Sequence, residues 1–459
     1  MFIDDTIAAV ATAPGEAGIG IVRLSGPKAL DIANKIFKPI KDGINLEKEI
    51  RKLIYGHVSE DDKIIDEVLI SYMKAPHTFT REDVVEINCH GGYISVRKIL
   101  EAVIRNGARL ADRGEFTKRA FLNGRIDLSQ AEAIIDIINA KTSASFDIAQ
   151  KQLEGNLSAS IKDIRDKLTM DLAKITVAID FPEEDEPEVT YEELSLDLQD
   201  IIEKIKNLIE SFETGKILRD GLKTVIVGKP NVGKSSLLNA ILKESRAIVT
   251  EIEGTTRDII EEYINIGGIP LKIVDTAGIR ETEDIVERIG VQKSKESFES
   301  ADLVIMMLDS SRHLSKEDED ILSLLGDQKA IIIVNKTDLS SLVTDDEIHN
   351  YAKGKPIVRI SALEKTGIDL LEKEIENMVL EGSLKTQNDI MVTNARHKMA
   401  LEKAFNACSD ALLALSDNIP LDIAETDFKN AWNELGNITG DTISEDLLDT
   451  IFREFCIGK

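Results

Sequence analysis

The chain has 459 residues, of which 42% are hydrophobic, so it can bury several cores and is not intrinsically disordered. It carries 56 basic against 83 acidic residues, a net charge of −27, which argues against tight binding to nucleic acid without a basic partner. The alternative is that the acidity only keeps the protein in solution.

No apolar run approaches the length needed to cross a bilayer, and the first residues lack the basic region of a signal peptide. The three cysteines, Cys89, Cys408 and Cys456, are too far apart in sequence for a disulfide framework or a zinc ribbon. We therefore expect a cytoplasmic protein that does not contact a membrane.

Residues 1–119 have the pattern of a mixed α/β domain, because short β-branched runs alternate with helical stretches near 28–37 and 95–106. The pattern then becomes helical. An apolar stripe at spacings of three and four runs from Leu153 to Ile179 and predicts one long amphipathic helix. A second helical run covers about 191–213 and is expected to end near Gly215.

Residues 222–379 alternate strands and helices, which is typical of a doubly wound, mostly parallel sheet, and we expect this domain to cover 214–382. The segment 383–459 is helical again. Because neither helical segment has an obvious partner within itself, we expect 120–213 and 383–459 to form one helical domain. The predicted architecture is multidomain, α/β plus all-α, with the doubly wound domain inserted between the two helical segments.

A phosphate-binding sequence, G-x-x-x-x-G-K-S, runs from Gly228 to Ser235 between a predicted strand and a predicted helix. Its backbone N–H groups and the helix dipole suit phosphate oxygens. Lys234 can place its charge on the β- and γ-phosphates, and the Ser235 hydroxyl can ligate Mg²⁺. The alternative is a chance glycine turn.

Three further motifs follow in order, each at the end of a predicted strand. Asp275, in Asp-Thr-Ala-Gly, can hold Mg²⁺. Asp338, in Asn-Lys-Thr-Asp, can accept two hydrogen bonds from the guanine edge, which adenine cannot donate. Ser361 and Ala362 fit a backbone contact to guanine O6. The four motifs together predict a GTPase domain with its nucleotide at the carboxyl ends of the strands.

The segment between the first two motifs contains threonines that can close over the γ-phosphate, although a plain polar connection is the alternative. Ile279 stands where a Ras-like switch has a water-orienting glutamine, so another group must do that work. The predicted GTP-binding residues are Asn231, Val232, Gly233, Lys234, Ser235, Ser236, Thr250, Glu251, Ile252, Glu253, Gly254, Thr255, Thr256, Asp275, Thr276, Ala277, Gly278, Asn335, Lys336, Asp338, Ser361 and Ala362.

Six sequence segments lie outside the motifs described so far. They are Ala11–Gly15, Gly20–Gly26, Arg81–Glu86, Gly114–Gly124, Asp180–Asp185 and Phe455–Lys459. Together with the inserted GTPase domain, these segments resemble the MnmE family of tRNA-modifying GTPases, also called TrmE, and the resemblance covers essentially the whole chain.

The resemblance implies an N-terminal domain that binds a tetrahydrofolate derivative and forms a homodimer. It also implies a heterotetramer with an FAD-containing MnmG-like protein, which would hold most of the tRNA. Together they would add an aminomethyl or carboxymethylaminomethyl group to C5 of the wobble uridine, with 5-formyl-tetrahydrofolate as a stable analogue of the one-carbon donor. The alternative is a GTP-gated binding switch in ribosome or RNA assembly, without folate chemistry.

The resemblance also implies roles for single residues. Arg23, Glu82, Arg125 and Lys459 match the family's folate-contacting positions. For Arg23 and Glu82 the alternative is a surface ion pair. Cys456 matches a cysteine for which the family has a proposed function; the alternative is that it is a buried apolar thiol. Glu287 matches the family's catalytic glutamate; the alternative is that it lies on a solvated helix face.

A potassium site is the last feature that follows the family pattern. Its predicted ligands are the side chain of Asn231, the backbone oxygens of Thr250 and Ile252, and the Thr255 hydroxyl. Thr256 would join Ser235 on Mg²⁺. Asn231 also fits a plain capping role in the loop.

Overall fold

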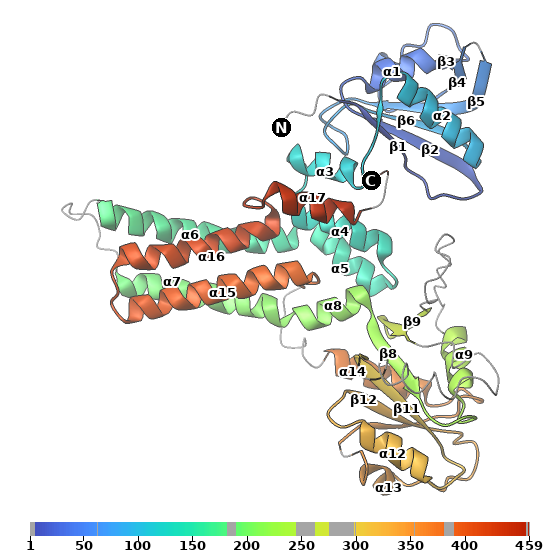
Figure 1. Ribbon diagram of the computed structural model, residues 1–459, viewed down its shortest axis with the longest axis vertical. Coiled ribbons are helices and arrows are strands. Elements are labelled where there is room, and N and C mark those ends of the chain that lie inside the picture. The colour runs from blue at the N-terminus through green and yellow to red at the C-terminus, as the bar shows by residue number, and fades with distance from the viewer. Residues whose placement is uncertain are drawn as a thin grey trace. The chain divides into compact units, whose positions relative to one another are not determined.

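The computed structural model describes residues 5–61, 63–180, 190–244, 262–274, 298, 300–352, 354–380, 390–455 and 458 (Figure 1). The chain divides into two compact units. The first contains residues 1–135 and 436–459, and the second contains residues 136–435. The domain boundaries expected from the sequence stay a prediction.

The first unit is built on a seven-stranded sheet in the order β3-β4-β5-β6-β2-β1-β7. All pairs are antiparallel except β1 with β7. The strands are β1 (Ile7–Val10), β2 (Ala17–Ser25), β3 (Phe37–Pro39), β4 (Ile54–Glu60), β5 (Lys63–Met73), β6 (Val84–Gly91) and β7 (Arg109–Leu110).

Helices α1 (Ala29–Ile36) and α2 (Tyr93–Arg105) share one apolar core with this sheet, as the mixed α/β pattern predicts. A 3₁₀ turn covers Leu46–Lys48. Helix α3 (Glu115–Leu122) follows β7 along the chain. Leu448 and Phe452 of the C-terminal helix α17 (Glu445–Arg453) share a small apolar core with Leu128, and Phe121 of α3 packs against this core.

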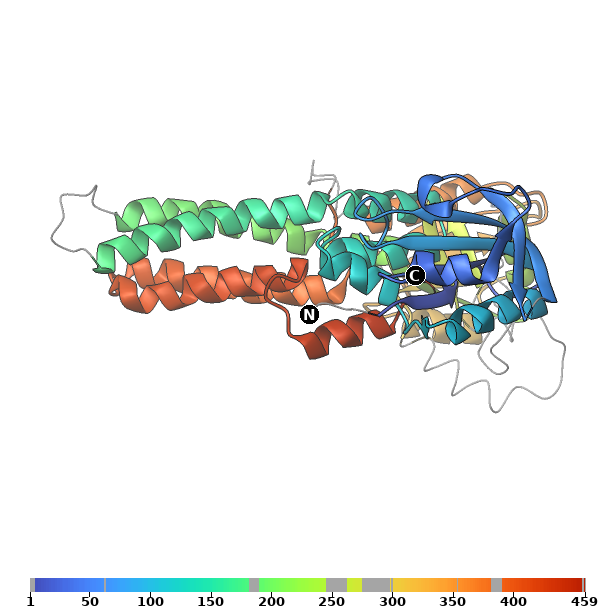
Figure 2. The ribbon, with the colours of Figure 1, turned by 90° about the horizontal axis from the view of Figure 1, so that it is seen from above.

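A long bundle of helices lies side by side in Figures 1 and 2. Its long helices are α6 (Asn156–Asp180), α7 (Tyr191–Glu210), α15 (Ala395–Ser416) and α16 (Leu421–Thr439). Helices α7 and α15 are in direct contact although the inserted domain separates them in sequence. The two helical segments therefore do pack together, as expected from their lack of internal partners.

The apolar stripe that begins at Leu153 does not form one helix. Leu153 is the last residue of α5 (Ser143–Leu153), which follows α4 (Leu128–Asn139). Gly155 has φ +94°, a left-handed conformation that interrupts the helix before α6 begins. The spacing of apolar residues continued across the break, so it could not reveal the break.

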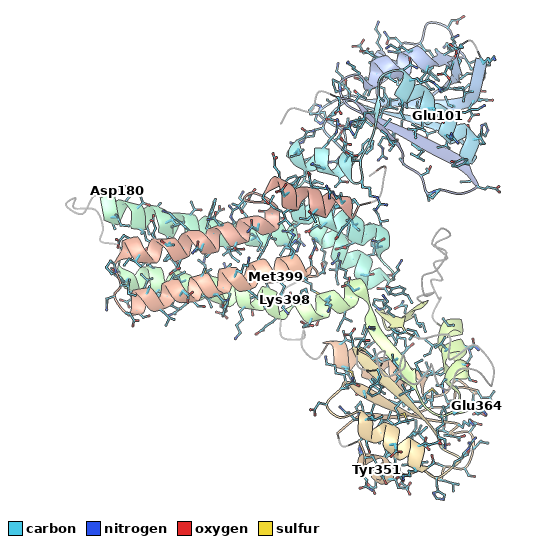
Figure 3. All side chains as sticks on the ribbon, viewed as in Figure 1. Glu101, Asp180, Tyr351, Glu364, Lys398 and Met399 are labelled. Carbon is cyan, nitrogen blue, oxygen red and sulfur yellow. The ribbon has the colours of Figure 1, made fainter. Side chains whose placement is uncertain are left out.

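The helix expected over about 191–213 is α7, which ends at Glu210, and Gly215 lies inside the next helix, α8 (Phe212–Asp220). A Cβ atom at this position would come within 2.3 Å of the Val392 carbonyl oxygen. The glycine therefore allows two backbones to approach rather than ending the helix. The ammonium of Lys398 on α15, labelled in Figure 3, lies 3.1 Å from a carboxylate oxygen of Glu213 on α8.

The inserted domain contains a six-stranded sheet in the order β13-β12-β11-β8-β10-β9. Every pair is parallel except the edge pair β9 with β10, which the sequence pattern did not predict. Its strands are β8 (Leu222–Val227), β9 (Glu262–Ile266), β10 (Ile269–Ile273), β11 (Leu303–Asp309), β12 (Ala330–Asn335) and β13 (Ile357–Arg359).

Helices cover both faces of this sheet, which confirms the doubly wound prediction. Helices α9 (Lys234–Glu244) and α14 (Ile368–Leu380) contribute to one core, and α12 (Lys316–Leu324) and α13 (Asp345–His349) contribute to the other. Strands β11 and β12 are buried along their whole length, as expected for central parallel strands. Among the described residues, none of the helices could cross a bilayer.

Candidate nucleotide-binding site

The loop Gly228–Gly233 joins β8 to α9 and lies against two neighbouring strands. A Cβ at Gly228 would come within 2.5 Å of the Met307 carbonyl oxygen on β11. A Cβ at Gly233 would come within 2.2 Å of the Asn335 side-chain nitrogen. Both glycines have positive φ, at +149° and +103°. The two positions are thus restricted to glycine by space as well as by backbone conformation.

Lys234, the first residue of α9, folds its side chain back over this loop. Its ammonium donates to the carbonyl oxygens of Gly228 at 2.5 Å and Lys229 at 3.1 Å. Burial lowers the pKa of Lys234. Because negatively charged phosphate oxygens are better acceptors than carbonyls, they can take over these hydrogen bonds. Ser235 and Ser236 follow in the first turn and are exposed.

Asn335 connects the phosphate-binding loop to the segment after β13. Its side-chain nitrogen donates to the Val232 carbonyl at 2.8 Å, and its side-chain oxygen accepts from the Ala362 N–H at 3.0 Å. Asn335 is buried, so both hydrogen bonds are shielded from water. The Ala362 N–H is occupied by Asn335 here, and its contact with guanine O6 stays a prediction.

Asp338 presents a carboxylate to solvent from the loop after β12. Its Oδ1 accepts a hydrogen bond from the buried Ser361 hydroxyl at 2.6 Å. Ser361 in turn accepts from the backbone N–H of Glu364 at 3.1 Å, and Glu364 is labelled in Figure 3. The hydroxyl therefore fixes the orientation of the carboxylate that is predicted to read guanine.

Several predicted residues lie outside the part of the chain that the structure describes. They are Thr250, Glu251, Ile252, Glu253, Gly254, Thr255, Thr256, Asp275, Thr276, Ala277, Gly278, Glu287, Cys456 and Lys459. The magnesium, potassium and catalytic roles assigned to them stay predictions.

The first unit holds the described members of the predicted folate set, each with polar partners. Arg23 on β2 forms an ion pair of 2.8 Å with Glu86 on β6. Glu82, whose side chain is 15% exposed, accepts from Ser25 at 2.7 Å and from Arg119 at 3.2 Å. Arg23 and Glu82 are therefore each ion-paired, but not to one another.

Arg125 donates to the Thr78 carbonyl at 3.0 Å, and its guanidinium lies over the Phe79 ring, 4.9 Å from the centroid. The Thr78 hydroxyl donates to the Glu82 carbonyl at 2.6 Å. Arg125 and Glu82 are thus held by the same loop, 78–82. Arg23 and Ser25 lie two residues apart on β2, so the strand brings Arg23 close to the same region.

Gly458, near the end of the chain, returns to this region. Its carbonyl accepts from Arg23 at 3.4 Å. Its φ is +90°, and a Cβ there would come within 2.2 Å of the Val10 carbonyl oxygen. The neighbouring Lys459 lies outside the described residues.

The sequence alone did not reveal the importance of Arg119, which is fully buried. Burial alone would lower its pKa, but Glu115, Glu82 and Asp5 raise it. Arg119 donates to Asp5 at 2.6 Å and to Glu115 at 2.9 Å. A single arginine therefore orients Glu82 from the side that faces the protein interior. Arg119 lies in α3, and nothing in the sequence of that segment indicates that its side chain is buried.

A phosphate-binding loop and a carboxylate predicted to read guanine, both at the carboxyl ends of a doubly wound sheet, are the arrangement expected of a GTPase. Residues 6–125 match the family model described as the GTP-binding protein TrmE N-terminus. Residues 128–456 match the model of the MnmE helical domain. The chain belongs to the MnmE family of tRNA modification GTPases, and binding of GTP and Mg²⁺ follows from this membership.

Curated relatives agree over the full length. The tRNA modification GTPase MnmE of Clostridioides difficile (strain 630) is 59% identical and covers 100% of both chains. The protein of the same name from Alkaliphilus metalliredigens (strain QYMF) is 58% identical, also over 100% of both. The G domain of the T. maritima FeoB iron transporter aligns with 35% of this chain and 98% of its own, at 23% identity and a TM-score of 0.26.

Proposed function

We propose that this tRNA modification GTPase hydrolyses GTP in a potassium-dependent reaction and uses a tetrahydrofolate one-carbon unit to modify the wobble uridine. The product carries an aminomethyl or carboxymethylaminomethyl group at C5. The observation that carries the folate part is the hydrogen bond from Arg23 to Gly458, because it brings the C-terminal segment to the proposed folate residues.

The residues around this contact suit a folate. A guanidinium such as that of Arg23 or Arg125 can pair with the carboxylates of the glutamate tail. A carboxylate such as that of Glu82 can accept from the amino-pyrimidine face of the pterin. Because Ser25 and Arg119 already hold the Glu82 carboxylate, its orientation would need little adjustment on binding. Lys459 would add a further cation.

Removal of the last three residues, Ile457 to Lys459, tests this site. We expect the truncated chain to lose binding of 5-formyl-tetrahydrofolate in calorimetry and to keep its GTP hydrolysis. A matched control is Lys118→Ala, which removes a cation that pairs with Asp449 of α17 in the same unit. Equal folate affinity in the truncated and full-length chains would show that the site lies elsewhere.

The partners belong to the same proposal. The N-terminal domain would form a homodimer, and an FAD-containing MnmG-like protein would complete a heterotetramer in the cytoplasm. The net charge of −27 supports a division of labour in which that partner holds most of the tRNA. The competing function is a GTP-gated switch in ribosome or RNA assembly, and measurable folate binding separates the two.

A further inference from the structure

Asp309 is a buried carboxylate next to the nucleotide site that none of the sequence motifs contains. It ends strand β11 and is 7% exposed. In the parallel register of β11 and β12, Asp309 lies opposite Asn335, the first residue of the Asn-Lys-Thr-Asp motif. A charged group buried at this point requires partners.

The two oxygens of Asp309 have different partners. Oδ1 accepts from the backbone N–H of Ser311 at 3.0 Å and from its hydroxyl at 2.6 Å. Oδ2 accepts from the Lys336 ammonium at 2.6 Å and lies 3.2 Å from Nε of Arg312. Burial alone would raise the pKa of Asp309, but the hydrogen bonds from Lys336 and Ser311 hold it below its usual value. The carboxylate is therefore ionised and fixed in orientation.

The neighbouring Ser310 holds the backbone of the same lysine. Its N–H donates to the Asn335 carbonyl at 2.9 Å, and its hydroxyl donates to the Lys336 carbonyl at 2.7 Å. Lys336 has φ +67°, a left-handed conformation that is uncommon for a residue other than glycine. Asp309 and Ser310 thus hold Lys336 at its ammonium and at its backbone carbonyl.

We infer that Asp309 is a positioning residue for guanine nucleotides, which acts by anchoring the Lys336 ammonium. A lysine fixed at both ends presents its four-carbon stem as an ordered apolar surface, two residues before the base-reading Asp338. Asp309 itself touches no nucleotide in this arrangement. The inference rests on the proposed placement of the guanine base at Asp338.

The release rate of N-methylanthraniloyl-GDP tests the inference in the full-length protein. Asp309→Asn removes the charge that holds Lys336 and so weakens a charge-assisted hydrogen bond. We therefore expect nucleotide release to become about tenfold faster. The turnover number at saturating GTP should stay within about twofold of wild type. The matched control is Asp302→Asn, because Asp302 accepts from the Lys223 N–H at the opposite end of the strands and should leave release unchanged.

A double-mutant cycle separates positioning from simple structural support. Lys336→Met keeps an apolar stem without the ammonium, and it should reproduce the faster release even if an Asp309 variant folds poorly. Adding Asp309→Asn to Lys336→Met should then cause little further change. Fully additive effects of the two substitutions, or wild-type release in both single variants, would overturn the inference. If Asp338→Asn leaves nucleotide selectivity unchanged, the guanine site itself is misplaced, which is a separate failure.

Discussion

At the scale of single residues, selectivity for guanine should depend on the Asp338 carboxylate. Asp338→Asn should weaken GTP binding at least about tenfold, because an amide cannot accept both guanine donors. The same variant should bind xanthosine triphosphate more tightly, since the xanthine 2-oxo group can accept from the new amide. Competition between the two nucleotides measures the change, with Asp302→Asn as the control. Unchanged GTP affinity would remove Asp338 from this role.

The residues of the proposed nucleotide and folate sites were predictable to different degrees. Gly228, Lys234 and Asp338 belong to motifs whose spacing carries the chemistry, so the sequence was sufficient to find them. Asp309 and Arg119 act through contacts between segments that are distant in sequence, and no local spacing reports such contacts. Asn335 is an intermediate case of predictability. Its motif is evident in the sequence, but its hydrogen bonds to Val232 and Ala362 are not.

At the scale of elements, the pairing of α6 with α7 contains a pH-sensitive contact. Asp171 on α6 is 1% exposed, and burial together with the charge of Asp197 on α7 raises its pKa to about 7. Lys174 lies 3.5 Å from Asp171 and 2.6 Å from Glu193 of α7, so its charge is shared. The protonated form of Asp171 is therefore the one that this helix pair stabilises.

The stability of the bundle should fall as the pH rises from about 4 to about 7. Between these values the folded chain keeps the proton of Asp171 and the unfolded chain releases it, which costs up to about 1.4 kcal/mol per pH unit. Asp171→Asn should flatten this dependence in thermal unfolding followed by circular dichroism. Asp163→Asn is the control, because Lys204 lowers the pKa of that exposed aspartate. The same pH dependence in Asp171→Asn and wild type would contradict the assignment.

The elements were predicted more reliably in type than in extent. The helical stretches predicted near 28–37, 95–106 and 191–213 correspond to α1, α2 and α7, each of which buries one face at a helical period. The break at Gly155 depends on its backbone conformation, and Gly215 inside α8 closely approaches Val392; periodicity records neither feature. The antiparallel β9 was missed because no motif or strand-helix alternation marks it.

At the scale of the whole molecule, hydrolysis should depend on the monovalent cation. Ile279 cannot orient water, so the proposed potassium site must offset charge in the transition state. We expect turnover at least about tenfold faster in KCl than in NaCl at equal ionic strength, a barrier difference of roughly 1.4 kcal/mol. Equal rates in the two salts would exclude this site and point to a cation supplied by a partner.

Two variants locate the potassium effect. Asn231 is exposed with φ +65°, so Asn231→Gly removes the side-chain oxygen without straining the left-handed backbone. It should erase most of the preference for KCl, as should Asn231→Ala. Asn239→Ala, an exposed asparagine on α9, is the control and should retain the preference.

Glu287→Ala should stop hydrolysis while nucleotide binding persists.

The contact between α8 and the segment before α15 has a consequence for how this architecture could arise. The Val392 N–H donates to the Ser211 hydroxyl at 3.0 Å, and the Val392 carbonyl approaches Gly215. The chain therefore leaves the helical bundle and re-enters it at neighbouring points. A gene segment that encodes a GTPase could be inserted at such a point with little disturbance to an ancestral bundle, since closing the gap requires only a short connection. The same proximity makes the inserted domain exchangeable, as a module that evolution or an engineer can replace.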